Sequence, residues 1–94
     1  MAEREIKIED YLKDRAEALG GLCWKLAPVS CVGLPDRLVL LPGGKIGFLE
    51  LKRPGRFPTA AQRHWMRELH ARGFAAGWTD DRDGVDEFLA ELNA

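Results

Sequence analysis

Three charged residues stand at the ends of two apolar segments of this 94-residue chain, and their spacing could place them in one site. Glu50 and Lys52 are two residues apart in a segment typical of a β-strand, so their side chains should point to the same face of a sheet. Asp36 comes just before the other segment. Two carboxylates beside a lysine form either the salt-bridged end of an ordinary hairpin or a site for a metal ion.

The turn between the two segments decides which of these alternatives is open to Asp36. A two-residue Gly43-Gly44 turn would pair Asp36 with Leu51 and put Asp36 on the face opposite Glu50. A three-residue loop, or a bulge near Asp36, would place Asp36 across from Glu50 or Lys52. The functional interpretation therefore predicts an odd loop or a bulge.

If the two carboxylates meet, their chemistry suits a hard divalent cation. Carboxylate oxygens are ligands for Mg²⁺ or Mn²⁺, with water and phosphate oxygens completing the coordination. Such a metal polarises a scissile phosphate and lowers the pKa of a bound water. Lys52 would then orient the attacking water or offset negative charge in the transition state.

Hydrophobic periodicity and turn residues predict the order α-β-β-β-α-β-α in one domain spanning residues 1–94. Residues 46–52 are nearly continuous in apolar side chains, which predicts a central strand covered on both faces. A mixed sheet flanked by helices is the natural packing of this order. The predicted helices are 2–19, 59–72 and a last one ending at Leu92 with Asp80 or Asp83 as its cap, and the predicted strands are 22–26, 37–41, 46–52 and 74–78.

Charge and cysteine content add a few limits. The net charge is −1, with a basic middle and an acidic tail, which fits either a solvated mixed surface or one anion-binding face. Cys23 and Cys31 follow neither a disulfide framework nor a zinc pattern, so we expect small apolar side chains with reduced thiols. No signal-like or membrane-length apolar run is present, and the prediction is a cytoplasmic protein.

Pro35-Asp36 followed by Glu50-Leu51-Lys52 resembles the signature of the PD-(D/E)XK nucleases. The longer pattern is similar to the VRR-NUC family, small nuclease modules found alone in phages and prophages and fused to larger repair nucleases. It comprises Gly33-x-Pro35-Asp36-Arg37, the run LPGGKIGFLELK, the RPG that follows, Gln62 and Trp65. The similarity covers nearly the whole chain.

The resemblance implies a restriction-endonuclease-like αβββαβ core with an extra C-terminal helix. It implies Mg²⁺ or Mn²⁺ at Asp36 and Glu50, the Leu51 carbonyl as a backbone ligand, and Lys52 as the catalytic lysine. An acid on the first helix usually joins the site. Of the candidates Glu3, Glu5 and Glu9, we choose Glu9, with Glu5 one turn earlier as the second choice.

Four residues of the second predicted helix need a role. Gln62 completes a Thr59-x-x-Gln62 capping box, and the family places a glutamine here near the metal, so the two roles can coexist. We expect Trp65 in the core, and His64 and His70 on the exposed surface.

The basic residues of the middle segment are expected to contact DNA phosphates and to recognise DNA shape rather than sequence; they are Lys45, Arg53, Arg56, Arg63 and Arg67. Arg37 could instead pair with an acid. Relatives often carry a basic loop where this chain has the uncharged residues 28–32, which could belong to an apolar contact.

The leading functional hypothesis is a homodimeric, Holliday-junction-resolvase-like endodeoxyribonuclease acting in DNA repair on branched, four-way DNA. A two-fold dimer would supply two active sites at a fixed separation. The alternatives are a flap or non-specific duplex nuclease, and a non-catalytic DNA-binding module with the same fold.

Overall fold

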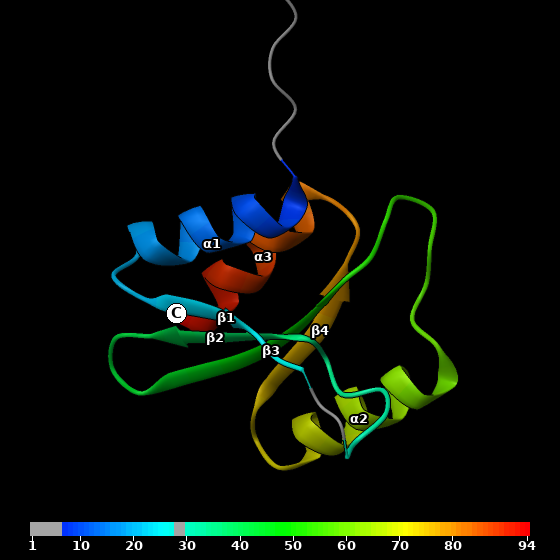
Figure 1. Ribbon diagram of the computed structural model, residues 1–94. Helices are drawn as coiled ribbons and strands as arrows, with labels where there is room; N and C mark the ends of the chain where they lie inside the picture. The colour runs from blue at the N-terminus through cyan, green and yellow to red at the C-terminus, as the bar shows by residue number, and fades with distance from the viewer. Residues whose placement is uncertain (1–6, 28–29) are drawn as a thin grey trace, which may run out of the picture.

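A computed structural model describes residues 7–27 and 30–94 (Figure 1). Within them the chain forms three helices and four strands in the predicted order. The elements are α1 (Ile8–Ala18), β1 (Leu22–Lys25), β2 (Arg37–Leu41), β3 (Lys45–Leu51), α2 (Ala60–Ala71), β4 (Ala75–Thr79) and α3 (Arg82–Asn93). The part of the first predicted helix before residue 7 lies outside the described residues.

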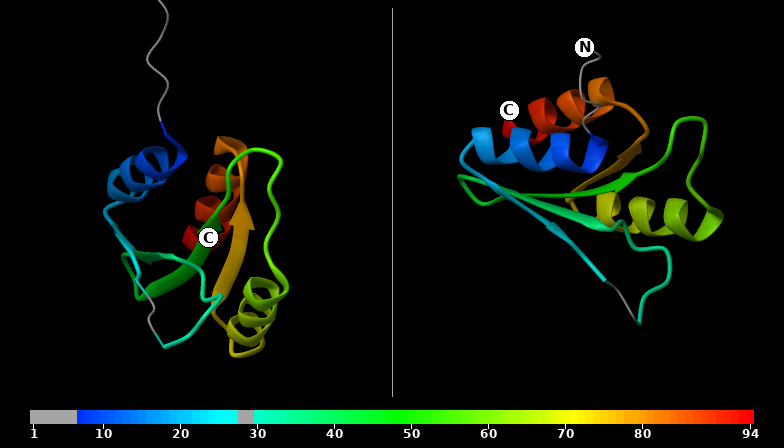
Figure 2. Two further views of the ribbon diagram at one scale, coloured as in Figure 1. Left: turned by 45° about the vertical axis from the view of Figure 1, so that its right-hand side comes forward. Right: turned by 45° about the horizontal axis from the view of Figure 1, so that its top comes forward.

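The strands form one mixed sheet in the order β1-β2-β3-β4, antiparallel up to β3 and parallel between β3 and β4. Helices α1 and α3 lie side by side on one face, and α2 lies on the other (Figures 1 and 2). The parallel pair needs a crossover, and α2 supplies it between β3 and β4. The predicted α/β class and mixed sheet flanked by helices are confirmed.

The core lies between the sheet and the α1–α3 layer. Every second residue of β2 is buried because alternate side chains of a strand face the same layer. Gly47 of β3 is part of this packing, since a Cβ there would come within 2.8 Å of the Phe88 ring of α3. The buried apolar side chains in this cluster are Leu12, Ala16, Val39, Leu41, Leu49, Val85 and Leu89.

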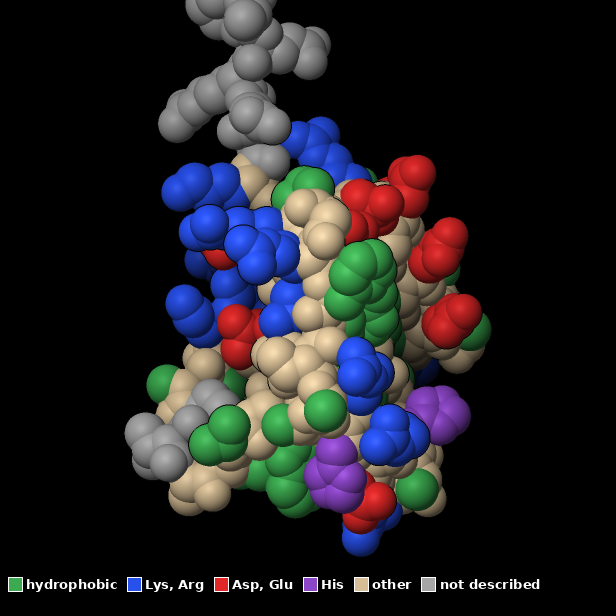
Figure 3. Space-filling model, turned by 90° about the vertical axis from the view of Figure 1, so that its right-hand side faces the viewer, with side chains coloured by type: hydrophobic (Ala, Val, Ile, Leu, Met, Phe, Trp, Pro, Cys, Tyr) green, Lys and Arg blue, Asp and Glu red, His purple; other side chains and the backbone are tan. Residues whose placement is uncertain are grey.

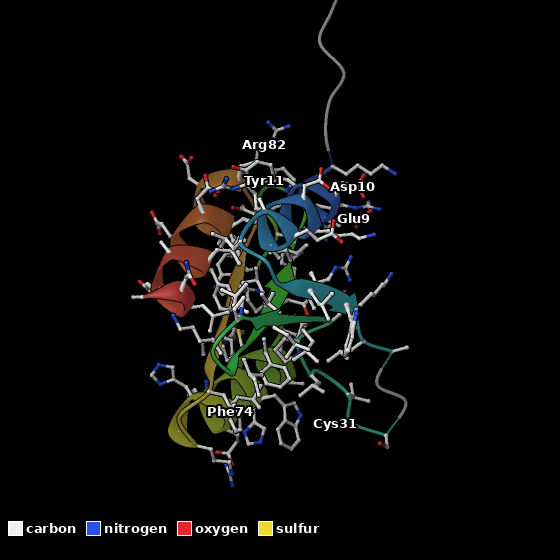
Figure 4. The ribbon with its side chains drawn as sticks, turned by 90° about the vertical axis from the view of Figure 1, so that its left-hand side faces the viewer. Glu9, Asp10, Tyr11, Cys31, Phe74 and Arg82 are labelled. Atoms are coloured by element: carbon white, nitrogen blue, oxygen red, sulfur yellow. The ribbon has the colours of Figure 1, made fainter. Side chains whose placement is uncertain are left out.

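Polar contacts of Tyr11 help to hold α1 against α3. The Tyr11 hydroxyl donates to the Asp86 carboxylate at 2.8 Å, and this hydrogen bond is the main reason that the pKa of Tyr11 is raised. The Arg82 guanidinium lies over the Tyr11 ring, 5.3 Å from its centroid (Figure 4). These contacts fix the helix that carries Glu9 relative to the rest of the fold.

The β2–β3 hairpin has the odd loop that the functional interpretation required. Leu41 pairs with Lys45, so the loop between them is the three residues Pro42, Gly43 and Gly44. Both glycines have positive φ, 90° and 74°, a conformation that other residues adopt only with strain. The ladder ends with Arg37 opposite Leu49, and its next position places Asp36 across from Glu50.

Two predictions about the helices and strands are wrong. The cap of α3 is Asp81, whose side chain accepts from the Gly84 amide, rather than Asp80 or Asp83. The predicted cover on both faces of β3 is also incomplete, because α2 packs on β4 and Ile46 of β3 stays exposed. Between residues 7 and 27 and from 30 to 94, no helix has the length and apolar character needed to span a membrane.

Candidate metal and nuclease site

The hairpin end brings Asp36, Glu50 and Lys52 together, as the register requires. The Asp36 backbone N–H donates to Glu50 Oε1 at 3.3 Å, and Lys52 Nζ lies 3.5 Å from Glu50 Oε2. Because Glu50 and Lys52 alternate with inward-facing Leu49 and Leu51, both lie on the face of the sheet that carries α2. The salt bridge and the carboxylate pair therefore coexist in one cluster.

The electrostatics of the cluster favour a bound cation. The Glu50 side chain is only 8% exposed. Its burial first, and then the neighbouring Asp36 carboxylate, raise the pKa of Glu50 above its usual value, although Lys52 opposes the shift. Asp36 Oδ1 is the one buried side-chain oxygen or nitrogen of the described residues that has no hydrogen-bond partner. A buried oxygen left without a donor beside the buried Glu50 carboxylate is an arrangement that suits a metal ligand.

The Leu51 carbonyl is a third oxygen that can serve this site. The Lys52 N–H donates across to Thr79 O of β4 at 2.9 Å. Because a trans peptide points its N–H and C=O in opposite directions, the Leu51 C=O is directed to the β2 side, where Asp36 lies. No third His, Cys, Asp or Glu of residues 7–27 and 30–94 joins the two carboxylates in a cluster. Two carboxylates and one carbonyl fit a hard cation that takes its other ligands from water and phosphate.

Glu9 is connected to the cluster through Arg37. The Arg37 guanidinium is buried and donates to Asp36 Oδ2 at 3.1 Å and to Glu9 Oε2 at 3.2 Å. Glu9 itself lies with Asp10 on α1, at the end of the molecule opposite Phe74 (Figure 4). The expectation that Arg37 pairs with an acid is therefore confirmed, and Glu3 and Glu5 lie outside the described residues.

The start of α2 positions the segment that leads into Asp36. Gly33 packs so closely on α2 that a Cβ there would lie 2.8 Å from the Ala61 backbone. Trp65 Nε1 donates to Val32 O at 3.0 Å. Gln62 forms the predicted capping box, since its side-chain oxygen accepts from the Thr59 N–H at 2.9 Å. Trp65 is half-buried and lies outside the buried core cluster, so the expectation of a core residue is wrong. His64 and His70 are exposed as expected.

The predicted DNA-binding residues divide into two groups. Arg53 and Arg56 are exposed in the loop that follows Lys52, while Arg63 donates to Pro58 O at 2.6 Å and Arg67 is exposed on α2. Lys45 lies at the other end of β3, about 17 Å along the strand from Glu50. It donates to Asn93 O at 2.7 Å. The fold therefore does not bring Lys45 to the site.

Sequence reasoning missed an aromatic pair beside the cluster. Trp78 is the register partner of Glu50 in the parallel β3–β4 ladder, and its ring contacts the ring of Phe57 with centroids 5.7 Å apart. Phe57 stands out as an aromatic residue in a loop of Arg, Pro and Gly, which is a signal available in the sequence. Reasoning also missed Lys25, which pairs in register with Arg37 and lines, with Glu9 and Lys13, a cleft between α1 and β1.

A mixed sheet whose hairpin end gathers an aspartate, a glutamate and a lysine defines the PD-(D/E)XK class of nuclease folds. A solved structure described as "VRR_NUC domain" superposes with a TM-score of 0.80 at 34% identity, over 88% of this chain and 90% of that one. The chain is also 47% identical over 74 residues to "Putative nuclease p44" of Acyrthosiphon pisum secondary endosymbiont phage 1. That match covers 79% of this chain and 75% of the phage protein. No family model matches the chain. On these two likenesses the chain belongs to the VRR-NUC family.

Proposed function

We propose that this protein is a metal-dependent endodeoxyribonuclease that hydrolyses a DNA phosphodiester bond at the Asp36–Glu50–Lys52 cluster. The observation that carries the proposal is the buried, unpartnered Asp36 Oδ1 beside a Glu50 whose pKa is raised. Both features destabilise the metal-free protein, and a bound cation would offset both by pairing with the two carboxylates. Asp36, Glu50 and the Leu51 carbonyl would hold the ion, Mg²⁺ or Mn²⁺.

The residues of the cluster have separable parts in the reaction. A divalent cation held there would supply positive charge beside the scissile phosphate and would lower the pKa of the attacking water. Lys52 holds its ammonium group 3.5 Å from Glu50, where it can orient that water and offset charge on the phosphate oxygens in the transition state. The partly buried position of Lys52, 18% exposed, strengthens its field relative to a solvated lysine.

Residues around the cluster would act through position. Arg37 holds Asp36 by one oxygen and leaves the other free, and Glu9 holds the guanidinium in place, so we assign Glu9 to the site through Arg37. Gln62 uses its oxygen in the capping box, which leaves its amide N–H groups as donors for a phosphate or water. Arg53, Arg56, Arg63 and Arg67 would neutralise DNA phosphates.

We further propose a homodimer that cuts four-way junctions. On the sheet face that carries α2, the part that the helix does not cover exposes three apolar side chains. They are Leu22, Trp24 and Ile46, which the strand register places on the same face and which are 49%, 51% and 38% exposed. An apolar face of this kind suits a second copy of the chain. This apolar patch lies on the same sheet face as Glu50, so a two-fold axis through the patch would set two active sites at a fixed separation.

Cleavage of matched four-way, flap and linear DNA with Mg²⁺ or Mn²⁺ tests the proposal. Wild type should nick or cut DNA, whereas Asp36→Ala and Lys52→Ala should lose most of that activity while keeping the fold. Equal activity in the wild type and both variants would refute the catalytic assignment. Cleavage of the flap but not the junction would remove the junction preference, and a light-scattering mass of one subunit would remove the dimer.

A further inference from the structure

The aromatic pair Phe57–Trp78 lies beside the metal cluster, and the proposed reaction does not use it. The two rings meet edge to face, 5.7 Å between centroids. Phe57 is 71% exposed and Trp78 36% exposed, so most of the Phe57 residue is open to solvent. An exposed ring that only stabilised the fold would be expected to turn inward, because apolar surface left in water contributes no burial energy.

The pair has a fixed place relative to the site. Trp78 and Glu50 are register partners in the parallel ladder, so their Cα atoms are about 5 Å apart and their side chains share a face. Phe57 belongs to the loop that begins at Lys52 and returns to α2. A hydrogen bond from Gly55 N to Asp80 Oδ2, 3.2 Å, ties this loop to the chain just after β4.

Charge around the pair is divided between its two sides. The loop carries Arg53 and Arg56 and no acid. Residues 79–83, after Trp78, carry three acids, Asp80, Asp81 and Asp83, and one base, Arg82. Figure 3 shows the side of the molecule on which the loop between β3 and α2 lies. On this side, hydrophobic side chains lie between a group of Lys and Arg and a group of Asp and Glu. A phosphate backbone would therefore be attracted to the arginine side and repelled from the other.

We propose that Phe57 and Trp78 form a stacking platform for an unpaired nucleobase of a DNA strand whose phosphates contact Arg53 and Arg56. The platform rests on the proposed nuclease function and adds a substrate class to it, namely DNA with an unstacked base next to the scissile bond. Flat aromatic faces bind any base, and a base inside an intact duplex cannot reach them. The ring of Phe57 takes the base, and Trp78 holds that ring in position.

The test separates base stacking from phosphate attraction and from catalysis. Affinity is measured in EDTA, where no strand is cut, for one duplex carrying a short single-stranded tail and for the same duplex with abasic residues in that tail. Wild type should bind the tail with bases more tightly, by about 5-fold to 150-fold, as expected for stacking of one base. Phe57→Leu, which keeps an apolar side chain but removes the ring, should abolish this preference, and Phe57→Tyr should keep it.

Phe74→Leu is the matched control, because Phe74 is also an exposed ring at an edge-to-face contact, with Phe48 near the other end of β4. It should leave the preference unchanged, and thermal melting of each variant shows that the fold is intact. Equal binding of the two tails by wild type, or an equal loss for both tails in Phe57→Leu, would overturn the platform. Absence of cleavage with Mg²⁺ or Mn²⁺ would instead refute the nuclease function and leave the binding result standing.

Discussion

Removing one charge from the carboxylate pair should stabilise the metal-free protein and abolish its response to metal. The pKa of Glu50 is raised above its usual 4.5 by burial and by Asp36, so the folded chain holds this proton more tightly than the unfolded chain does. The stability that comes from the protonated carboxyl is complete below pH 4.5 and is lost as pH rises through the higher folded pKa. Glu50→Gln removes this loss, so the metal-free variant should be more stable than wild type at pH 7.5.

Bound metal should make wild type more stable than Glu50→Gln, which reverses their order of stability in the metal-free state. At ten times its dissociation constant, a cation that binds only the folded wild type adds about 1.4 kcal/mol. For a chain of this length that raises Tm by about 6 to 11 °C. A variant with hundredfold weaker affinity would gain less than about 0.1 kcal/mol at the same concentration, which no melting curve resolves.

The assay is thermal unfolding of wild type and Glu50→Gln at pH 7.5, in EDTA and over a Mg²⁺ or Mn²⁺ titration, repeated in EDTA at lower pH. Glu68→Gln is the control, because Glu68 is a half-buried acid of α2 that pairs with Arg72 away from the cluster. It should shift with metal as wild type does. A metal-induced shift kept by Glu50→Gln, or a metal-free variant less stable than wild type at pH 7.5, would refute the reasoning.

Three further predictions follow from the contacts around the site. Gly33→Ala forces a methyl against Ala61 at a φ of 94°, and should lower the unfolding free energy by about 1–3 kcal/mol in a denaturant titration; an unchanged midpoint would contradict the close packing. Arg37→Gln should reduce the metal-induced rise in Tm because Arg37 contacts Asp36 directly, whereas Glu9→Gln should keep the rise because Glu9 contacts only Arg37 of this pair. Loss of the rise in Glu9→Gln would instead identify Glu9 as a metal ligand. Arg56→Ala should lower the slope of log affinity against log salt by about 0.9 on duplex DNA, and an unchanged slope would exclude a phosphate contact.

Local patterns in the sequence were sufficient to predict the hairpin, but they left a two-residue and a three-residue loop open. Pro42-Gly43-Gly44 has glycines where positive φ is needed, and the apolar segments on either side fix which faces are buried. The odd loop then determines that Asp36 meets Glu50. The Thr59–Gln62 capping box likewise depends on residues three apart. These features could be predicted because each is decided within a few residues of chain.

Features that depend on distant elements could not be predicted in the same way. The partner of Glu50 on β4 is set by how α2 returns the chain to the sheet, and no local pattern predicts that this partner is Trp78. The bridge from Glu9 to Arg37 joins residues 28 positions apart across α1 and β2. The remote position of Lys45 follows from the length of β3, although Lys45 is close in sequence to Glu50.

The start of α2 is where these separate parts of the site become dependent on one another. Gly33 packs on Ala61 and Trp65 holds the Val32 carbonyl, so the first turns of α2 fix the segment that leads into Asp36. The same turns anchor the end of the loop that follows Lys52 and carries Arg53 and Arg56, because Arg63 donates to Pro58 O. A change that frays this helix end would therefore move the proposed metal ligand Asp36 and the loop proposed to contact DNA together. A defect in metal affinity accompanied by a defect in DNA affinity is thus expected from α2 variants, whereas Phe57 variants should affect DNA binding alone.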